Sequence, residues 1–333
     1  MARISRVAAA ALMVAVLVPS AIAGTASATP PTDQKIETIG SEGTRTVPAY
    51  DEGRLVQVFE ANFWASAGER RYISSNVLAK QGTGTSDPLL MAQTSIICAG
   101  TGSQQVGANM NVQRGQSITL NPRFVFISQN SGNVSCKLYA AGRRPDPTGS
   151  PASSNTWFVD YGSYLAVSAP MPSWTRTFDT SSLTSKRLDD PGDNWTPIDK
   201  TFTIASGVTQ FDLISDHKVT VCSSSGGSED STTNGPLCTG DVVVPGGDSV
   251  VSLTVRVRQK TAGGAWCGGP QTLVDGKTYL VTREIHHRML FSKGVVTVDP
   301  DCAPVFTVTA NIKLESGVAT VVHAPNETTL VTS

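Results

Sequence analysis

The sequence predicts an all-β protein: two tandem antiparallel β-sandwich domains, immunoglobulin-like or jelly-roll-like, stapled by disulfides after an N-terminal signal peptide. Three observations lead to this prediction. Short apolar strands recur about every 8 to 12 residues between Gly, Pro and Asn, as in sandwiches and barrels. Beyond the leader, no window has the apolar period of about 3.6 residues that indicates an amphipathic helix. A strand that ends in cysteine, followed by a loop, a second strand and a second cysteine, also occurs twice, at Cys98 and Cys136 and again at Cys222 and Cys267. This repeat predicts a duplicated module.

Residues 1–28 are interpreted as a secretory signal peptide. Two arginines precede an apolar run over 7–18, and small-x-small cleavage motifs end at Ala23 and Ala28. The run is short for a bilayer span, and no second long apolar run follows. We therefore expect a secreted, extracellular protein with no transmembrane segment after signal removal. The choice between the two cleavage sites stays open.

Composition divides the rest of the chain. Residues 29–47 contain prolines and scattered charges, which predicts a flexible lead-in. A first β-sandwich domain is expected over 48–168 and a second over 200–333. Residues 169–199 are Pro-rich and are interpreted as a linker, because proline interrupts the hydrogen-bond ladder of a central strand.

Strands are expected where β-branched, aromatic and aliphatic residues gather between turn residues. In the first domain these segments are 54–59, 71–78, 94–98, 117–120, 123–127, 136–139, 157–161 and 164–167. In the second they are 201–204, 210–214, 218–222, 241–244, 249–258, 278–291, 295–298, 305–314 and 318–322. Asp275-Gly276 is a hairpin signal ahead of the run 278–291.

The repeated unit also suggests a disulfide pattern. An even number of cysteines in an exported chain favours disulfides, although spacing alone does not determine their connectivity. If the duplication is real, Cys98–Cys136 and Cys222–Cys267 are equivalent bridges. Cys238–Cys302 then remains as a third bridge, specific to the second copy.

Charge and motifs exclude several function classes. The formal net charge is −1, and removing the two leader arginines makes it −3, so the chain lacks the basic field that attracts nucleic acid. There is no Cys-x-x-Cys pair and no Gly-x-Ser-x-Gly elbow. We expect no nucleic-acid partner, no metal and no cofactor.

Two groups of residues are candidates for binding a ligand. Trp157, Tyr161 and Tyr164 form an aromatic cluster that can stack on sugar rings, although such residues also serve as strand packing. Glu284, His286 and Arg288 alternate along the run 278–291 and would share one strand face. Such a face can bind a carboxylate or tune a general base. The same pattern of alternating charges is also typical of a solvated strand face with no ligand.

These observations predict a secreted, non-catalytic structural or binding protein whose partner is an extracellular glycan or a cell-envelope component. The alternative is a secreted hydrolase of polysaccharide or peptidoglycan that uses carboxylates such as Asp160 and Glu284 on a sheet face. A hydrolase requires an acid pair, or a His/acid pair, in a concave cleft, whereas a binding module presents a flat or grooved face with aromatics. The sequence does not indicate an oligomeric state.

Overall fold

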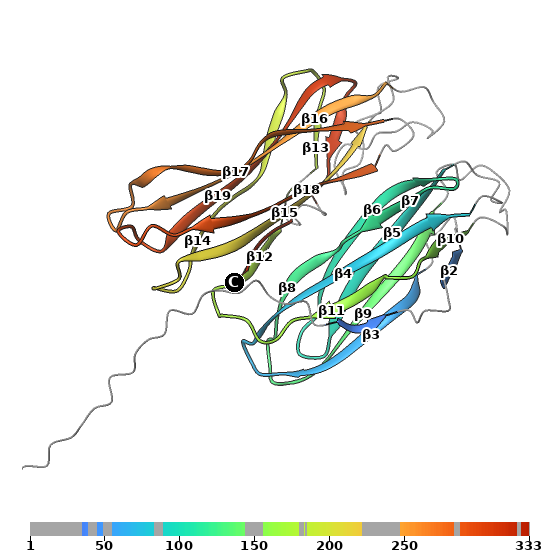
Figure 1. Cartoon of the computed structure of the whole chain (residues 1–333), viewed down its shortest axis with the longest axis horizontal. Helices are drawn as coiled ribbons and strands as arrows, with labels where there is room; N and C mark the ends of the chain where they lie inside the picture. The colour runs from blue at the N-terminus through green and yellow to red at the C-terminus, as the bar shows by residue number, and fades with distance from the viewer. Residues whose placement is uncertain are drawn as a thin grey trace, which may run out of the picture.

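The computed structural model describes residues 35–38, 45–48, 55–82, 89–143, 156–179, 183, 185–221, 247–282, 287–324 and 328–332. Its regular elements are antiparallel strands in four sheets, so the predicted all-β sandwich class is confirmed. The described part of the chain contains no helix that is long and apolar enough to cross a membrane. The strands form two bodies (Figure 1), which we call module 1 (β1 to β11) and module 2 (β12 to β21). The predicted signal peptide lies outside the described residues.

Module 1 packs two antiparallel sheets face to face. The larger sheet contains β1 (Lys35–Thr38), β2 (Arg45–Pro48), β4 (Arg70–Gln81), β7 (Ser117–Leu120), β8 (Arg123–Ile127), β10 (Thr156–Val159) and β11 (Tyr164–Val167). The smaller sheet has the order β3-β9-β5-β6, with β3 (Val56–Ala65), β9 (Gly132–Arg143), β5 (Leu89–Ala99) and β6 (Gln104–Gln113).

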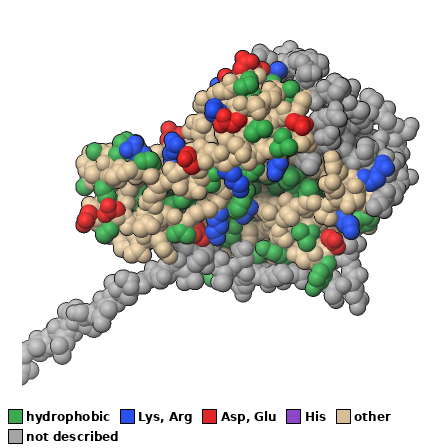
Figure 2. Space-filling view, turned by 45° about the horizontal axis from the view of Figure 1, so that its top comes forward, with side chains coloured by type: hydrophobic (Ala, Val, Ile, Leu, Met, Phe, Trp, Pro, Cys, Tyr) green, Lys and Arg blue, Asp and Glu red, His purple; other side chains and the backbone are tan. Residues whose placement is uncertain are grey.

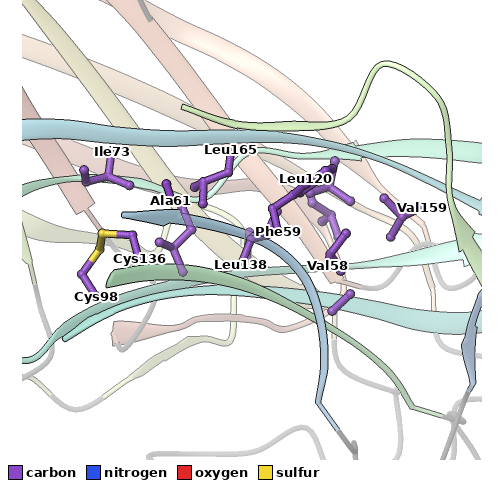
Figure 3. Close-up of a cluster of buried hydrophobic side chains, with 14 of the residues drawn as sticks. Val58, Phe59, Ala61, Ile73, Cys98, Leu120, Cys136, Leu138, Val159 and Leu165 are labelled. Carbon is purple, nitrogen blue, oxygen red and sulfur yellow. A yellow bond between two sulfur atoms is a disulfide. The ribbon is translucent and has the colours of Figure 1, made fainter. Parts of the chain in front are cut away.

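The core of module 1 follows from the alternation of its strands. Phe59, Phe126 and Trp157 are its largest fully buried side chains. Cys98 and Cys136 lie directly opposite each other on β5 and β9, and their disulfide joins the apolar cluster (Figure 3). This confirms the first predicted bridge.

Module 2 repeats the two-sheet arrangement. One sheet contains β12 (Arg176–Asp179), β21 (Thr328–Thr332), β15 (Gln210–Val221), β20 (Thr320–Val322), β13 (Lys186–Leu188) and β18 (His287–Thr297). The other has the order β14-β19-β16-β17, with β14 (Asn194–Thr203), β19 (Val305–Gly317), β16 (Ser249–Lys260) and β17 (Trp266–Val281). Phe202, Phe211 and Phe306 meet in its core, with ring centroids 5.0 to 5.8 Å apart.

Two predicted connecting segments contribute strands instead. Within the predicted lead-in 29–47, β1 pairs with β11, and β2 (which ends at Pro48) pairs with β10. Within the predicted linker 169–199, β12 pairs with β21, β13 pairs with β20, and β14 begins its pairing with β19. Of these three strands only β14 contains a proline, Pro197, which lies on a sheet edge where the register with β19 shifts, so its missing N–H costs no ladder bond.

The prediction of one strand over 278–291 is wrong. Residues up to Val281 belong to β17, whereas His287 onward form β18 in the opposite sheet. The Asp275-Gly276 pair makes no hairpin. Gly276 adopts φ +60° inside β17, where the register with β16 shifts, and its N–H donates to Thr254 Oγ1 at 3.1 Å. The expected strand 241–244 lies outside the described residues.

The second disulfide corrects the pairing taken from the repeat. Cys267 on β17 bonds to Cys302, which follows β18, with Cα atoms 6.1 Å apart. This contradicts both predicted bridges of the second copy, Cys222–Cys267 and Cys238–Cys302. Cys222 and Cys238 themselves lie outside the described residues. The two observed bridges are not equivalent, because Cys98 and Cys136 join neighbouring strands of one sheet whereas Cys267 joins a strand to a loop.

Candidate ligand-binding surface

The outer side of β3 is polar because of a β-bulge followed by strict alternation. The register against β9 shifts between Gln57 and Phe59. After that shift Phe59 and Ala61 point into the core, so Glu60, Asn62 and Trp64 point outward. The bulge therefore determines which side chains reach solvent on this strand.

The outward residues of β9 continue the same surface. Trp64 lies opposite Asn133, Asn62 opposite Ser135, and Glu60 opposite Lys137. We call this surface the polar face and define it by its β3 and β9 residues Gln57, Glu60, Asn62, Trp64, Asn133, Ser135, Lys137 and Tyr139. It contains amide, hydroxyl and aromatic side chains with one pair of opposite charges.

Hydrogen bonds hold the side chains around Glu60 in place. The Ser135 hydroxyl donates to Glu60 Oε1 at 2.8 Å, and the Gln57 amide donates to Oε2 at 3.1 Å. Lys137 Nζ lies 3.8 Å from Oε1. The hydrogen bond from Ser135 is the main cause that lowers the pKa of Glu60 below its ordinary value, so the carboxylate is ionised at neutral pH. It is an acceptor here and not a general acid.

Trp64 is the aromatic side chain of the polar face that is exposed to solvent. Its side chain is 57% exposed, although a tryptophan on a sandwich strand commonly packs inward. An exposed indole offers a flat apolar ring, and the amides and hydroxyls beside it can both donate and accept hydrogen bonds. Tyr139 is half-buried and lies six residues along β9 from Asn133, about 20 Å away at the usual strand rise.

The predicted aromatic cluster is divided by the structure. Trp157 is fully buried, and its Nε1–H donates to the Ala141 carbonyl at 3.2 Å, so its ring is unavailable for stacking on a ligand. Tyr161 is 62% exposed in the turn before β11. Tyr164 is half-buried on β11 between β1 and β4. Of the three, Tyr161 alone offers an open ring.

The second predicted group is not assembled within the described residues. Glu284 and His286 lie outside them, and Arg288 belongs to β18 in the sheet opposite β17. The Arg288 guanidinium is 5.7 Å from the Tyr279 ring centroid and donates to the Leu280 carbonyl. Arg288 therefore links β18 to β17, a structural contact that explains its position.

Two histidines meet at a hydroxyl that sequence reasoning did not single out. His287 Nδ1 and His323 Nε2 each lie 2.6 Å from Thr220 Oγ1. Elsewhere in the described residues, Cys267, Asp299 and Cys302 bring three potential metal-ligand atoms together. Since these two cysteines form a disulfide, their sulfur atoms are not thiolate ligands.

A pocket of about 280 Å³ lies where the two modules meet. Ala108, Met110, Thr119 and Asn121 line it from module 1, and Met289 and Phe291 line it from β18. Figure 2 shows Lys and Arg side chains near the middle of one face of the molecule, with apolar side chains beside them. The pocket therefore has mostly apolar walls, and Arg123 and Asp216 also belong to its lining.

One carboxylate lines this pocket, and it is already paired. Asp216 Oδ2 lies 3.0 Å from Arg123 Nε, and Arg123 Nη2 donates to Oδ1 at 3.4 Å. Burial raises the pKa of Asp216 to about 6, while Arg123 opposes that shift. Asp160, which the hydrolase alternative requires, accepts a hydrogen bond from the N–H of Tyr161 in a turn. The described lining contains no acid pair.

The polar face was missed in the sequence because a bulge hides its period. Leu55 and Val58 break the expected alternation of the first strand, so the outward position of Trp64 does not follow from counting along the chain. The alternation of apolar and polar residues from Phe59 to Ala65, taken alone, does predict that Glu60, Asn62 and Trp64 share the outer side of the strand.

No known sequence family and no curated protein matches the chain. Three structural comparisons cover most of it. A tandem CBM22 domain of Paenibacillus barcinonensis Xyn10C aligns with 92% of this chain and 98% of its own, at 9% identity and TM-score 0.24. The infectious bursal disease virus VP2 subviral particle aligns with 92% and 75%, at 8% identity and TM-score 0.29. A Parabacteroides distasonis protein described as a putative secreted protein aligns with 91% and 88%, at 10% identity and TM-score 0.18. At such scores these similarities support no conclusion about this chain.

Proposed function

We propose that the protein is a secreted glycan-binding protein that holds its ligand on the polar face of module 1. The observation that carries the proposal is the exposure of Trp64 on a sheet face otherwise made of amide and hydroxyl side chains. The disulfides suit an oxidising, extracellular compartment.

The chemistry of this face matches the two sides of a sugar. A pyranose presents an apolar ring face, which stacks on indole, and a rim of hydroxyl groups that both donate and accept hydrogen bonds. Gln57, Asn62 and Asn133 supply amides with both capacities. The Glu60 network fixes part of the face before binding, which lowers the entropy lost when a ligand is captured.

Binding is favoured over hydrolysis by the positions of the acidic groups. Glu60 is bonded to Ser135, Gln57 and Lys137 on an open surface, and Asp216 is paired with Arg123. Neither carboxylate faces a second one across a cleft in the part of the chain that the structure covers. Glycoside hydrolysis needs two carboxyl groups flanking the scissile bond.

Retention on insoluble polysaccharides tests the proposal. The mature protein is mixed with cellulose, xylan, chitin or purified peptidoglycan, and the unbound fraction is measured. For the polymer retained, Trp64→Ala is expected to weaken binding by at least about tenfold, as loss of a central aromatic contact does. Tyr161→Ala, measured in parallel, decides whether the turn before β11 contributes a second stacking ring.

Leu280→Ala is the matched control, because Leu280 is 50% exposed on module 2 and lies away from the polar face. This variant is expected to bind like the unmodified protein. Failure of the unmodified protein to bind any polymer, or equal retention of Trp64→Ala, would reject the assignment.

A further inference from the structure

The outer side of module 2 carries a row of cations. Val255, Val257 and Gln259 of β16 point into the core, so the intervening Arg256, Arg258 and Lys260 point outward. Residues two apart on a strand are separated by about 6.6 Å, and three positive charges therefore follow one another along one line. We call these three side chains the cation row.

Trp266 lies beside one end of this row. It pairs with Lys260 across β16 and β17 and is 45% exposed. The Arg258 guanidinium lies 4.4 Å from its ring centroid, and Lys260 Nζ lies 5.5 Å from it. These cation–π contacts hold the indole and both cations in a defined arrangement while leaving part of the ring open.

The carboxylates around the row neutralise one end of it. Asp275 lies 3.4 Å from Arg256, with both side chains mostly exposed. Asp199 of β14 is in register with Arg256 but two strands away, about 10 Å. The backbone of Asp299 is hydrogen-bonded to the Gln259 side chain. Gln259 points to the core side of β16, opposite to the cation row. Within the described residues, neither Arg258 nor Lys260 forms an ion pair.

The neighbouring strand β19 is uncharged beside the two arginines of the row. Thr307 and Thr309 of β19 lie opposite Arg258 and Arg256. The modules contact each other through the other sheet of module 2, where Ile214 and Leu330 pack against Tyr72 and Val125. Among the described residues, this contact between the modules thus does not involve the outer side of β16 and β17.

We propose that this face is a second binding site, for an anionic glycan whose acidic groups pair with the cation row and whose sugar ring stacks on Trp266. A glycan is the occupant that uses both features, because a neutral sugar leaves the cations unpaired and a simple anion leaves the indole unused. This site differs from the polar face in module, charge and ligand, so each can fail without the other.

Binding to polygalacturonate tests the site, with its fully methyl-esterified form as the uncharged polymer of the same backbone. A phosphomannan distinguishes phosphate from carboxylate groups. Dissociation constants are measured by calorimetry at two salt concentrations. We expect at least one acidic glycan to bind, the esterified polymer to bind at least about tenfold more weakly, and salt to weaken the acidic complex.

Two sets of variants locate the contact. Arg258→Gln/Lys260→Gln is expected to lose about tenfold or more in affinity and most of the salt dependence, and Trp266→Ala to lose affinity while keeping the salt dependence. The control Lys80→Gln/Lys186→Gln removes the same charge from exposed sites on β4 and β13 and should bind normally. Trp64→Ala should also bind normally.

Three results would overturn the proposal. One is that neither acidic glycan binds. Another is an equal loss in Lys80→Gln/Lys186→Gln, which would show that only net charge matters. The third is equally tight binding of duplex DNA, which would show attraction to any polyanion without use of the sugar ring.

Discussion

Asp216 and His217 are neighbours on β15 whose burial shifts their pKa values in opposite directions. Burial lowers the pKa of His217 from 6.5 to about 3, and the ring instead bonds to the Ser215 hydroxyl at 2.6 Å. Burial raises the pKa of Asp216 from 3.8 to about 6, against the opposing charge of Arg123. Each residue keeps its neutral form over a wider pH range than it would in water.

The two shifts give opposite dependences of stability on pH. The unfolded chain binds the His217 proton more tightly, so this residue's contribution is present above pH 6.5 and is lost as pH falls toward 3, by up to about 5 kcal/mol. The folded chain binds the Asp216 proton more tightly, so its contribution is present below pH 3.8 and is lost as pH rises through about 6.

Two variants should therefore change the acid response in opposite directions. His217→Gln is expected to lose less stability than the unmodified protein between pH 7 and pH 4, and Asp216→Asn to lose more. Urea unfolding at pH 7, 5 and 4 measures the free energy of unfolding. Parallel pH profiles for all three proteins would contradict this account of the two residues.

At the scale of elements, the two disulfides close loops of similar length in different surroundings. Cys98 and Cys136 are fully buried, 38 residues apart, between neighbouring strands. Cys267 and Cys302 are 35 residues apart and half-buried. Chain entropy alone gives each bridge about 4 kcal/mol. We expect Cys98→Ala/Cys136→Ala to cost more than Cys267→Ala/Cys302→Ala, because it also removes core packing.

Denaturant unfolding of the two double variants measures this difference, and mapping the disulfides in the unmodified protein checks the pairing. Equal losses of stability would show that only loop closure matters. A bridge between Cys222 and Cys267 would contradict the structure and restore the pairing that the repeat suggested.

For the whole molecule, the junction includes a buried ion pair between the modules. Arg123 of β8 pairs with Asp216 of β15, and its guanidinium lies 4.7 Å from the Phe291 ring centroid. Arg123→Met leaves Asp216 buried without its counter-charge, which is expected to cost about 3 to 5 kcal/mol at pH 7.5. Arg123→Met/Asp216→Leu should recover most of that loss, because it leaves no buried charge.

Urea unfolding at pH 7.5 of both single variants and the double variant gives the coupling energy. Additive losses would mean that the two side chains do not interact and that the modules do not meet as described. Near pH 4 the cost of Arg123→Met should shrink, because Asp216 is then protonated.

Much of the fold could be predicted because strands and turns are local signals. Periodicity and turn residues predicted the all-β sandwich class, and register on β5 and β9 bears out Cys98–Cys136. Local signals failed where pairing with a distant strand determines the structure. The Pro-rich segment 169–199 supplies edge strands because β21 and β20, far away in the sequence, lie beside it. The run 278–291 divides between two sheets because β17 and β18 belong to opposite layers of the sandwich, and local sequence does not show which layer a strand joins.

The strand-rich, disulfide-containing character of this protein follows from local sequence, since propensity and spacing act over a few residues. Which of its side chains face outward depends on how the strands pair and pack. A bulge on β3 turns Trp64 to solvent, and strand pairing places Trp266 beside the cation row. Trp157, by contrast, is fully buried between the packed sheets of module 1. Exposure depends on contacts between segments far apart in the chain, so the binding surfaces emerge only once the sheets are packed.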